Sequence, residues 1–219
     1  MHLRPSRIGC AILAAGISPR TGGGKRLVAL AGQPLVQRVT LAACRSRVAR
    51  TAVVVGSAAD DVANAVCHLP VDIISNPLSH EGVASSVRSA VGWARGRRFD
   101  GLLLAMADPL ALSTAHLDAL VAGSDGALQV VGSAYEGVLG LPALFPRDCY
   151  SRLEGLTGDV DARAILLDAD PDFPVLIINL PRAALDDPAD FARRAEPPGS
   201  RAPRPPLAVS RRTPERSRG

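Results

Sequence analysis

Short apolar runs alternate with amphipathic stretches as far as Ala122, and this alternation predicts strands that alternate with helices. The apolar runs typical of buried strands are 8–13, 51–55, 71–74 and 101–105. Segments with helical spacing are 34–44, 58–66, 83–94 and 114–122, the last with Ser113 as its expected cap. Repeated β-α-β units require a mostly parallel sheet with right-handed crossovers. We therefore predict an α/β fold in three layers, with a Rossmann-like, mostly parallel sheet between helices.

The pattern changes after Gly123. We expect strands at 128–131 and 141–145 around a turn at Glu136 and Gly137, a short helix at 161–167, a strand at 175–179 and a helix at 187–194. From Glu196 onward Pro, Arg, Ser and Gly dominate, which is typical of disorder. The chain therefore divides into one domain, 1–194, and a basic tail, 195–219.

Charge and hydropathy narrow the class of partners. Six arginines and two glutamates follow Arg194, so the tail carries the whole net charge of +4 and the domain is neutral. A neutral domain argues against nucleic acid as a partner. No stretch approaches the roughly 20 apolar residues that cross a membrane, and the four cysteines form no C-x-x-C pair. We expect a cytoplasmic protein with reduced thiols and no membrane contact.

A glycine-rich loop follows the first strand directly, from Leu13 to Lys25. In open α/β sheets ligands bind at the carboxyl ends of strands, and glycines let backbone N–H groups approach phosphate oxygens. Arg20 and Lys25, the only lysine in the chain, add positive charge. Pro19 and Arg26 exclude a P-loop, and the dinucleotide fingerprint lacks its third glycine. The loop predicts a triphosphate site, with a solvated surface lysine as the alternative for Lys25.

This loop resembles the L-A-A-G-x-S-x-R-x-G-x-x-K signature of the MobA-like NTP transferases, and is most similar to the molybdenum cofactor cytidylyltransferases. Further resemblances follow in the family's order, at 32–35 (G-x-P-L), 76–88 (N-P-x-x-x-x-G-x-x-S-S-L-R), 107–108 (A-D), 140–142 (G-H-P), 158–163 (G-D-x-G-A-R) and 185–188 (I-D-T-P). The resemblance implies the nucleotide-diphospho-sugar transferase type of fold and a nucleotidyltransferase activity. The nucleotide contacts that it implies are Leu13, Ala14, Ala15, Gly16, Arg20, Lys25, Asn76, Gly82 and Ser85.

The resemblance also implies Mg²⁺ as cofactor, with Asp108 as its ligand and Asp186 as a second candidate. Asp108 follows the strand expected at 101–105, so its carboxylate would meet the phosphates held by Lys25. As alternatives, Asp108 could cap a turn before Pro109, and Asp186 could cap the helix at 187–194. We expect Arg20, Lys25 and Asp108 to carry catalysis by positioning and charge, without a general base. His68, His80 and His116 are expected at the surface or in loops.

Departures from the family pattern fall on the acceptor side. Pro109 stands where the family has Gln, Asp161 replaces a glycine, and Leu141 replaces a histidine. Ala15 favours CTP over GTP. We therefore expect transfer of CMP from CTP to a phosphate-bearing small molecule of the molybdopterin type, with a molybdoenzyme or its chaperone as a possible partner. The alternatives are GTP or a sugar phosphate as substrate, or a nucleotide-binding chaperone or sensor without activity.

Overall fold

The structure of the chain is a computed structural model. It describes residues 6–15, 29–30, 32–56, 59–107, 112–124, 129–135, 138–168 and 174–180. The helix expected at 187–194 and the tail expected at 195–219 lie outside these residues.

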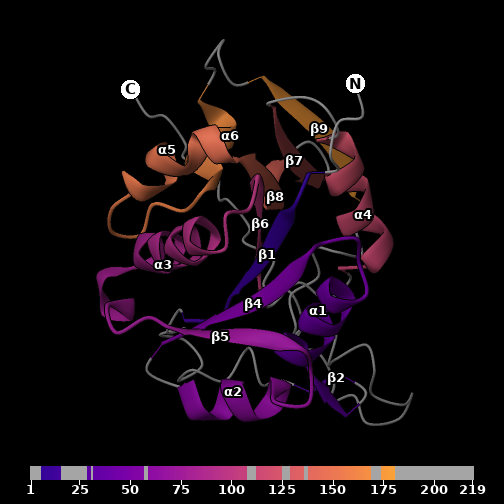
Figure 1. The fold of residues 1–219 in the computed structure, drawn as a ribbon, viewed down its shortest axis with the longest axis vertical. Helices are drawn as coiled ribbons and strands as arrows, with labels where there is room; N and C mark the ends of the chain where they lie inside the picture. The colour runs from indigo at the N-terminus through magenta and orange to yellow at the C-terminus, as the bar shows by residue number, and fades with distance from the viewer. Residues whose placement is uncertain are drawn as a thin grey trace, which may run out of the picture.

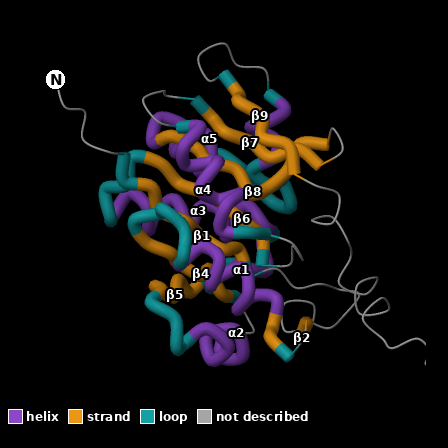
Figure 2. Tube along the Cα trace, turned by 90° about the vertical axis from the view of Figure 1, so that its right-hand side faces the viewer, coloured by secondary structure: helices purple, strands orange, loops and turns teal. Residues whose placement is uncertain are grey.

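A seven-stranded sheet forms the centre of the domain, in the order β5-β4-β1-β6-β8-β7-β9 (Figure 2). Its strands are β1 (Ile8–Leu13), β4 (Arg50–Val55), β5 (Val71–Ser75), β6 (Gly101–Met106), β7 (Val130–Tyr135), β8 (Val138–Pro146) and β9 (Val175–Leu180). The first four run parallel, and β9 is parallel to β7. Only β8 runs against its neighbours. The prediction of a mostly parallel sheet is therefore confirmed.

Alternate side chains of β1 enter two separate cores, because successive residues of a strand point to opposite faces. Ala11 and Leu13 lie in one core, against α3 (Val83–Gly96), α5 (Tyr150–Glu154) and α6 (Arg163–Leu167). Cys10 and Ile12 lie in the other, against α1 (Leu35–Cys44), α2 (Ala59–Val66) and α4 (Thr114–Gly123). Figure 1 shows α3, α5 and α6 on the left of the sheet and α1 and α4 on its right. The three predicted layers are present.

Most predicted elements begin and end within two residues of the observed ones, and the strands β7 and β8 are the exceptions. The strands β7 and β8 form a longer hairpin than expected, with a register shift between Gly132 and Ser133. Helix α6 begins two residues later than predicted, since the Asp161 carboxylate accepts the Arg163 backbone N–H at 2.8 Å. The helix α5 and the two-residue strands β2 (Ala29–Leu30) and β3 (Gln33–Pro34) were not predicted.

Candidate active site

The carboxyl ends of β5, β4, β1 and β6 lie side by side at one edge of the sheet. Backbone hydrogen bonds continue past these ends: Ala14 N–H donates to the Val54 carbonyl at 2.9 Å, and Ala107 N–H donates to the Leu13 carbonyl at 3.2 Å. The first residue after β1 is therefore held by β4, and the first residue after β6 is held by β1. Ala15 leads into the glycine-rich loop, and Ala107 leads into the loop that carries Asp108.

The five residues with predicted phosphate, catalytic or metal roles lie outside the described part of the chain. These are Gly16, Arg20, Lys25, Asp108 and Asp186. Within the described ranges no group of three His, Cys, Asp or Glu side chains could hold a metal ion. The sheet nevertheless fixes where two of the loops start, because Leu13 and Met106 are paired residues of adjacent strands. The roles of the five residues outside the described part of the chain stay predictions.

Leu13, Ala14 and Ala15 are all buried. Leu13 and Ala15 pack toward α3, and Ala14 packs toward α1. Their side chains therefore belong to the core, and contact with a nucleotide would come from the backbone of this segment. The nucleotide contacts predicted for these three residues stay predictions.

Gly56, directly after β4, is a site residue that the sequence reasoning missed. A Cβ at this position would lie 2.7 Å from the Ala15 carbonyl oxygen and 2.7 Å from the Ser79 side chain. Only glycine therefore lets the end of β4 pass between the start of the glycine-rich loop and the 76–82 loop. The available signal was a single glycine placed directly after an apolar strand, as in the loop after β1.

Asn76 organises the loop that follows β5. Its side chain is buried, and its amide group donates to Ser85 Oγ at 2.9 Å and Ser86 Oγ at 3.0 Å. Its Oδ1 accepts the Leu78 N–H at 3.1 Å, and Ser85 Oγ donates to the Gly82 carbonyl at 2.8 Å. The side chains of Asn76 and Ser85 thus tie the loop to the first turn of α3, and their contacts with the nucleotide stay predictions.

Gly82 joins two of the segments on which the family resemblance rests. Its φ is +103°, and a Cβ there would lie 2.3 Å from the Gly158 carbonyl oxygen and 2.7 Å from Asp159 Oδ1. The Ala84 N–H donates to the same Gly158 carbonyl at 3.1 Å. Arg88 adds a second link, from its guanidinium to the Leu156 carbonyl at 2.7 Å. The start of α3 and the 156–159 segment therefore form one rigid wall of the site.

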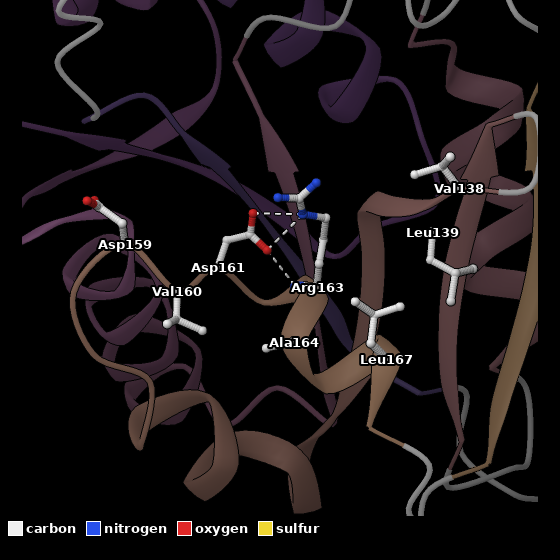
Figure 3. A pocket seen from close by; sticks show the side chains of 8 residues that line it. All are labelled: Val138, Leu139, Asp159, Val160, Asp161, Arg163, Ala164 and Leu167. Atoms are coloured by element: carbon white, nitrogen blue, oxygen red, sulfur yellow. Dashed lines mark hydrogen bonds and ion pairs between the residues drawn. The ribbon is translucent and has the colours of Figure 1, made fainter. Parts of the chain in front are cut away.

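A cavity of about 700 Å³ opens beside this wall, between β8 and α6 (Figure 3). Its apolar lining consists of Val138, Leu139, Val160, Ala164 and Leu167. Its charged lining consists of Asp159, Asp161 and Arg163. A cavity of this size accommodates a small organic molecule. Asp159 lines the cavity and also lies against Gly82 at the start of α3.

Asp161 and Arg163 form an ion pair on the cavity wall. The Arg163 Nε donates to the Asp161 carboxylate at 2.9 Å, and the Arg163 backbone N–H donates to it at 2.8 Å. Figure 3 shows the two terminal nitrogens of Arg163 pointing away from α6. Among the described residues, no hydrogen bond is made by these terminal nitrogens. The pair is therefore neutral as a unit and keeps donors for a ligand.

His116 corrects one expectation, because it lies in the interior rather than at the surface. It is 6% exposed, and its Nε2 lies 2.9 Å from Ser133 Oγ, which donates to the Pro142 carbonyl. Since the Ser133 hydroxyl proton is used there, the His116 Nε2–H donates to Ser133 Oγ. Burial lowers the pKa of His116 to about 4. The residue connects α4 to the register shift in β7 and lies apart from the cavity residues.

None of the helices in the described ranges is long and apolar enough to cross a membrane.

One similar protein matches this chain over less than half of its length. The chain is 35% identical to the purine catabolism protein PucB of Bacillus subtilis over 88 residues, which are 40% of this chain and 42% of that protein. In this match the chain spans less than half of that relative.

Solved structures match over most of the chain. Rv0371c of Mycobacterium tuberculosis is 25% identical with a TM-score of 0.69, over 86% of this chain and 97% of that one. A complex of the same protein with manganese is 23% identical with a TM-score of 0.66, over 86% and 97%. A nucleotidyl transferase from Methanothermobacter is 20% identical with a TM-score of 0.72, over 86% and 95%. The chain thus has the fold of nucleotidyltransferases.

The family model described as the MobA-like NTP transferase domain matches residues 10–172. This range begins in β1 and runs through the loops after β1, β4, β5 and β6 to the region beyond α6. It therefore contains both halves of the site, the strand-end region and the cavity. The chain belongs to the MobA-like NTP transferase family.

Proposed function

We propose that this protein transfers CMP from CTP to the phosphate of a molybdopterin-type acceptor and releases pyrophosphate. One observation carries the proposal: the glycine-rich loop and the Asp108 loop start from neighbouring strands, next to a ligand-sized cavity. The pairing of Leu13 with Met106 brings the starts of both loops together at the sheet edge. A triphosphate held there would have its acceptor site a short way along the same edge.

The nucleotide half of the reaction rests on positive charge held by the loop. Lys25 and Arg20 would bind the triphosphate oxygens and stabilise the negative charge that grows on the leaving pyrophosphate. Such groups act most strongly when the protein holds them in place before reaction. The contacts of Gly56 with Ala15 and Ser79 support this, because they fix the path of the chain at the start of the loop.

A divalent cation fits the carboxylates proposed for it, since Mg²⁺ prefers hard oxygen ligands together with substrate phosphates. Asp108 would hold the ion, with Asp186 as a second ligand. When bound, the ion neutralises charge on the triphosphate. The Ala107 N–H to Leu13 carbonyl bond supports this role for Asp108, because it holds the preceding residue against β1.

In the chemical step, an acceptor phosphate oxygen attacks the α-phosphorus of CTP. A new P–O bond forms as the bond to the β-phosphate bridging oxygen breaks, and pyrophosphate leaves with that electron pair. The attacking oxygen is ionised near neutral pH, so no general base is needed. The protein then contributes orientation and charge stabilisation.

The choice of CTP over GTP rests on Ala15, which stands where the guanylyl branch has glycine. Ala15 is buried at the start of the loop and its methyl group packs in the core, so it would act on the choice of base through the path of the loop backbone. One methyl group supplies about 1–3 kcal/mol of discrimination. The reaction would take place in the cytoplasm, where CTP is available, and a molybdoenzyme or its chaperone would receive the product.

The test is pyrophosphate release by the full chain, with CTP, GTP, ATP and UTP in turn, Mg²⁺, and molybdopterin present or absent. The proposal predicts release with CTP that depends on both Mg²⁺ and molybdopterin. Pyrophosphate release with GTP and not with CTP would reject CTP as the substrate and favour transfer of GMP. Nucleotide binding without pyrophosphate release under every condition would contradict enzymatic activity and favour a nucleotide-binding chaperone or sensor.

Two substitutions connect the activity to the proposed residues. Lys25→Ala should lose roughly 100- to 1,000-fold in rate, the scale for removing one preorganised charge-stabilising donor, and Asp108→Asn at least as much. Arg98→Ala is a matched control, since Arg98 lies in the turn after α3 and makes no ion pair with any described residue. Near-normal turnover of either test variant would remove that residue from the mechanism.

A further inference from the structure

The cavity between β8 and α6 has apolar walls that are open to solvent. Val138 is 63% exposed, Val160 is 47% exposed and Leu167 is 70% exposed, although each has a large aliphatic side chain. All three line the same cavity. A ligand with a flat, weakly polar ring would cover these side chains and remove their apolar surface from water.

The charged residues of the cavity disfavour a phosphate there. Among the described residues that line it, two aspartates, Asp159 and Asp161, accompany one arginine, so this part of the lining carries a net charge of −1. That arginine, Arg163, is already paired through its Nε to Asp161. A phosphate placed here would meet uncompensated negative charge, whereas an uncharged carbonyl group could still accept from the terminal nitrogens of Arg163.

We propose that Asp161 is a specificity-determining residue that makes this cavity a site for an uncharged, hydrogen-bonding ring of the acceptor. Arg163 donates from its terminal nitrogens to a ring carbonyl, and Asp159 accepts from ring N–H or amino groups. This inference rests on the proposed function, since the acceptor there has a pterin-type ring and a phosphate. The ring occupies the cavity, and the phosphate extends toward the strand ends.

The position of Asp159 supports this orientation. Its carboxylate lies against Gly82 at the start of α3, so it forms the boundary between the cavity and the strand-end region. Under the proposed function, Arg20 and Lys25 would supply positive charge on the strand-end side of that boundary. A ligand with a neutral end and an anionic end therefore has one orientation in which both ends meet complementary groups.

Asp161 also fixes the geometry of Arg163. Its carboxylate receives both the backbone N–H and the Nε of Arg163, which holds the arginine at the first position of α6. A glycine at 161, as in the family pattern, would leave the guanidinium unpaired and free to bind a phosphate. The substitution that distinguishes this chain thus changes both the charge of the cavity and the direction of its donors.

Direct binding of two fluorescent probes tests the proposal without any nucleotidyl transfer. The probes are 6-hydroxymethylpterin, which is uncharged at neutral pH, and its phosphate monoester. We expect wild-type full-length protein to bind the uncharged pterin saturably, because the cavity takes the ring alone. Asp161→Asn keeps the shape and an acceptor oxygen but removes the charge, so it should shift the ratio of affinities toward the ester by about three- to tenfold.

Asp168→Asn is the matched control, because Asp168 pairs with Arg152 at the other end of α6 and does not line the cavity. It should leave the ratio unchanged. Arg163→Gln should weaken binding of the uncharged pterin several-fold, which tests the site even if Asp161→Asn folds poorly. The proposal is overturned if the uncharged pterin does not bind saturably, if Asp161→Asn leaves the ratio unchanged, or if both aspartate variants shift the ratio equally.

These outcomes are separable from those for the proposed function. Pyrophosphate release with molybdopterin and an unchanged affinity ratio in Asp161→Asn would reject only the role of Asp161. A shift of the ratio in Asp161→Asn without pyrophosphate release would keep the ring site and reject the reaction.

Discussion

Gly82 shows how strongly one residue can constrain the site. Its backbone has a φ of +103°, in the region that favours glycine, and its Cα faces the Gly158 carbonyl directly. A side chain would therefore cost both backbone strain and a steric clash. Since Gly82 lies between the strand-end region and the cavity, the same clash would displace both halves of the site.

We expect Gly82→Ala to destabilise the protein by at least about 2 kcal/mol. The measurement is the free energy of unfolding by urea, with Gly92→Ala as control. Gly92 lies in α3 with nothing within 4 Å of its added Cβ, so alanine there should be neutral or stabilising by up to about 1 kcal/mol. Equal stability of the two variants would contradict the close contact with Gly158.

His116 predicts a pH dependence of stability. Burial lowers its pKa from 6.5 to about 4, so the folded state favours the neutral ring. The contribution of His116 to the free energy of unfolding is complete above pH 6.5 and is lost as the pH falls toward 4. The reason is that the unfolded chain, in which the histidine has its ordinary pKa, takes up the proton at a higher pH than the folded chain. A shift of this size corresponds to at most about 3 kcal/mol.

The corresponding measurement is urea unfolding of wild type and His116→Gln at several pH values between 7.5 and 4.5. The glutamine keeps a donor for Ser133 but cannot take up a proton in this range. We expect the variant to lose less stability on acidification than wild type. Identical pH profiles would show that the buried imidazole does not cause the effect.

At the scale of elements, the loop after β5 is attached to α3 through Asn76. The buried amide makes two hydrogen bonds to serines of the first turn and one to the loop backbone. Its removal leaves buried polar groups without partners, which is costly. The loop and the helix start would then no longer hold each other in place.

We expect Asn76→Ala to lower the free energy of unfolding by about 1–3 kcal/mol and to weaken CTP binding as well. Asn64→Ala is the matched control, since Asn64 is an exposed residue of α2 whose side chain makes no hydrogen bond to a described residue. Calorimetry with CTP measures both effects on one sample. Unchanged CTP affinity in a destabilised variant would limit Asn76 to a role in folding.

The sequence predicted the elements whose patterns are long and regular. The strand at 8–13 and the cap at Ser113 were predicted correctly, since an apolar run and a capping serine are local signals. The helix α5 was missed because a single turn with two buried side chains, Tyr150 and Leu153, has too little periodicity. The burial of His116 depends on the register shift in β7, which is a property of strand pairing.

The site was predicted in the same uneven way. Motif spacing selected Asn76, Gly82 and Ser85, and the structure brings all three together. Motif spacing did not indicate that Asn76 and Ser85 are buried and form hydrogen bonds within the protein. Gly56 and the ion pair of Asp161 with Arg163 require knowledge of which loops meet, which one segment of sequence does not contain.

At the scale of the whole molecule, the sheet places one chemistry-bearing loop beside another. Strands β1 and β6 are neighbours, as their paired register shows. Yet Gly101, where β6 starts, comes 88 positions after Leu13, where β1 ends. Helices on both faces bury the sheet and leave its carboxyl edge for ligands. We therefore expect the functional residues at that edge and in the cavity beside it.

The basic segment 196–219 should be dispensable on this account. Deleting it should change the barrier to pyrophosphate release by less than about 0.5 kcal/mol, the usual scale of surface changes. The comparison is the steady-state rate of full-length and shortened protein at low and high salt. A large loss of rate restored by neither condition would give this segment a role in the site.

The central claim is that the glycine-rich loop and the Asp108 loop form one nucleotide site. Thermal unfolding with CTP, with and without Mg²⁺, tests it most directly in wild type, Lys25→Ala and Asp108→Asn. At 100 times its dissociation constant CTP adds about 2.7 kcal/mol of stability. We predict Mg²⁺-dependent protection of wild type that both substitutions abolish. Protection of either variant to the wild-type extent would contradict the claim.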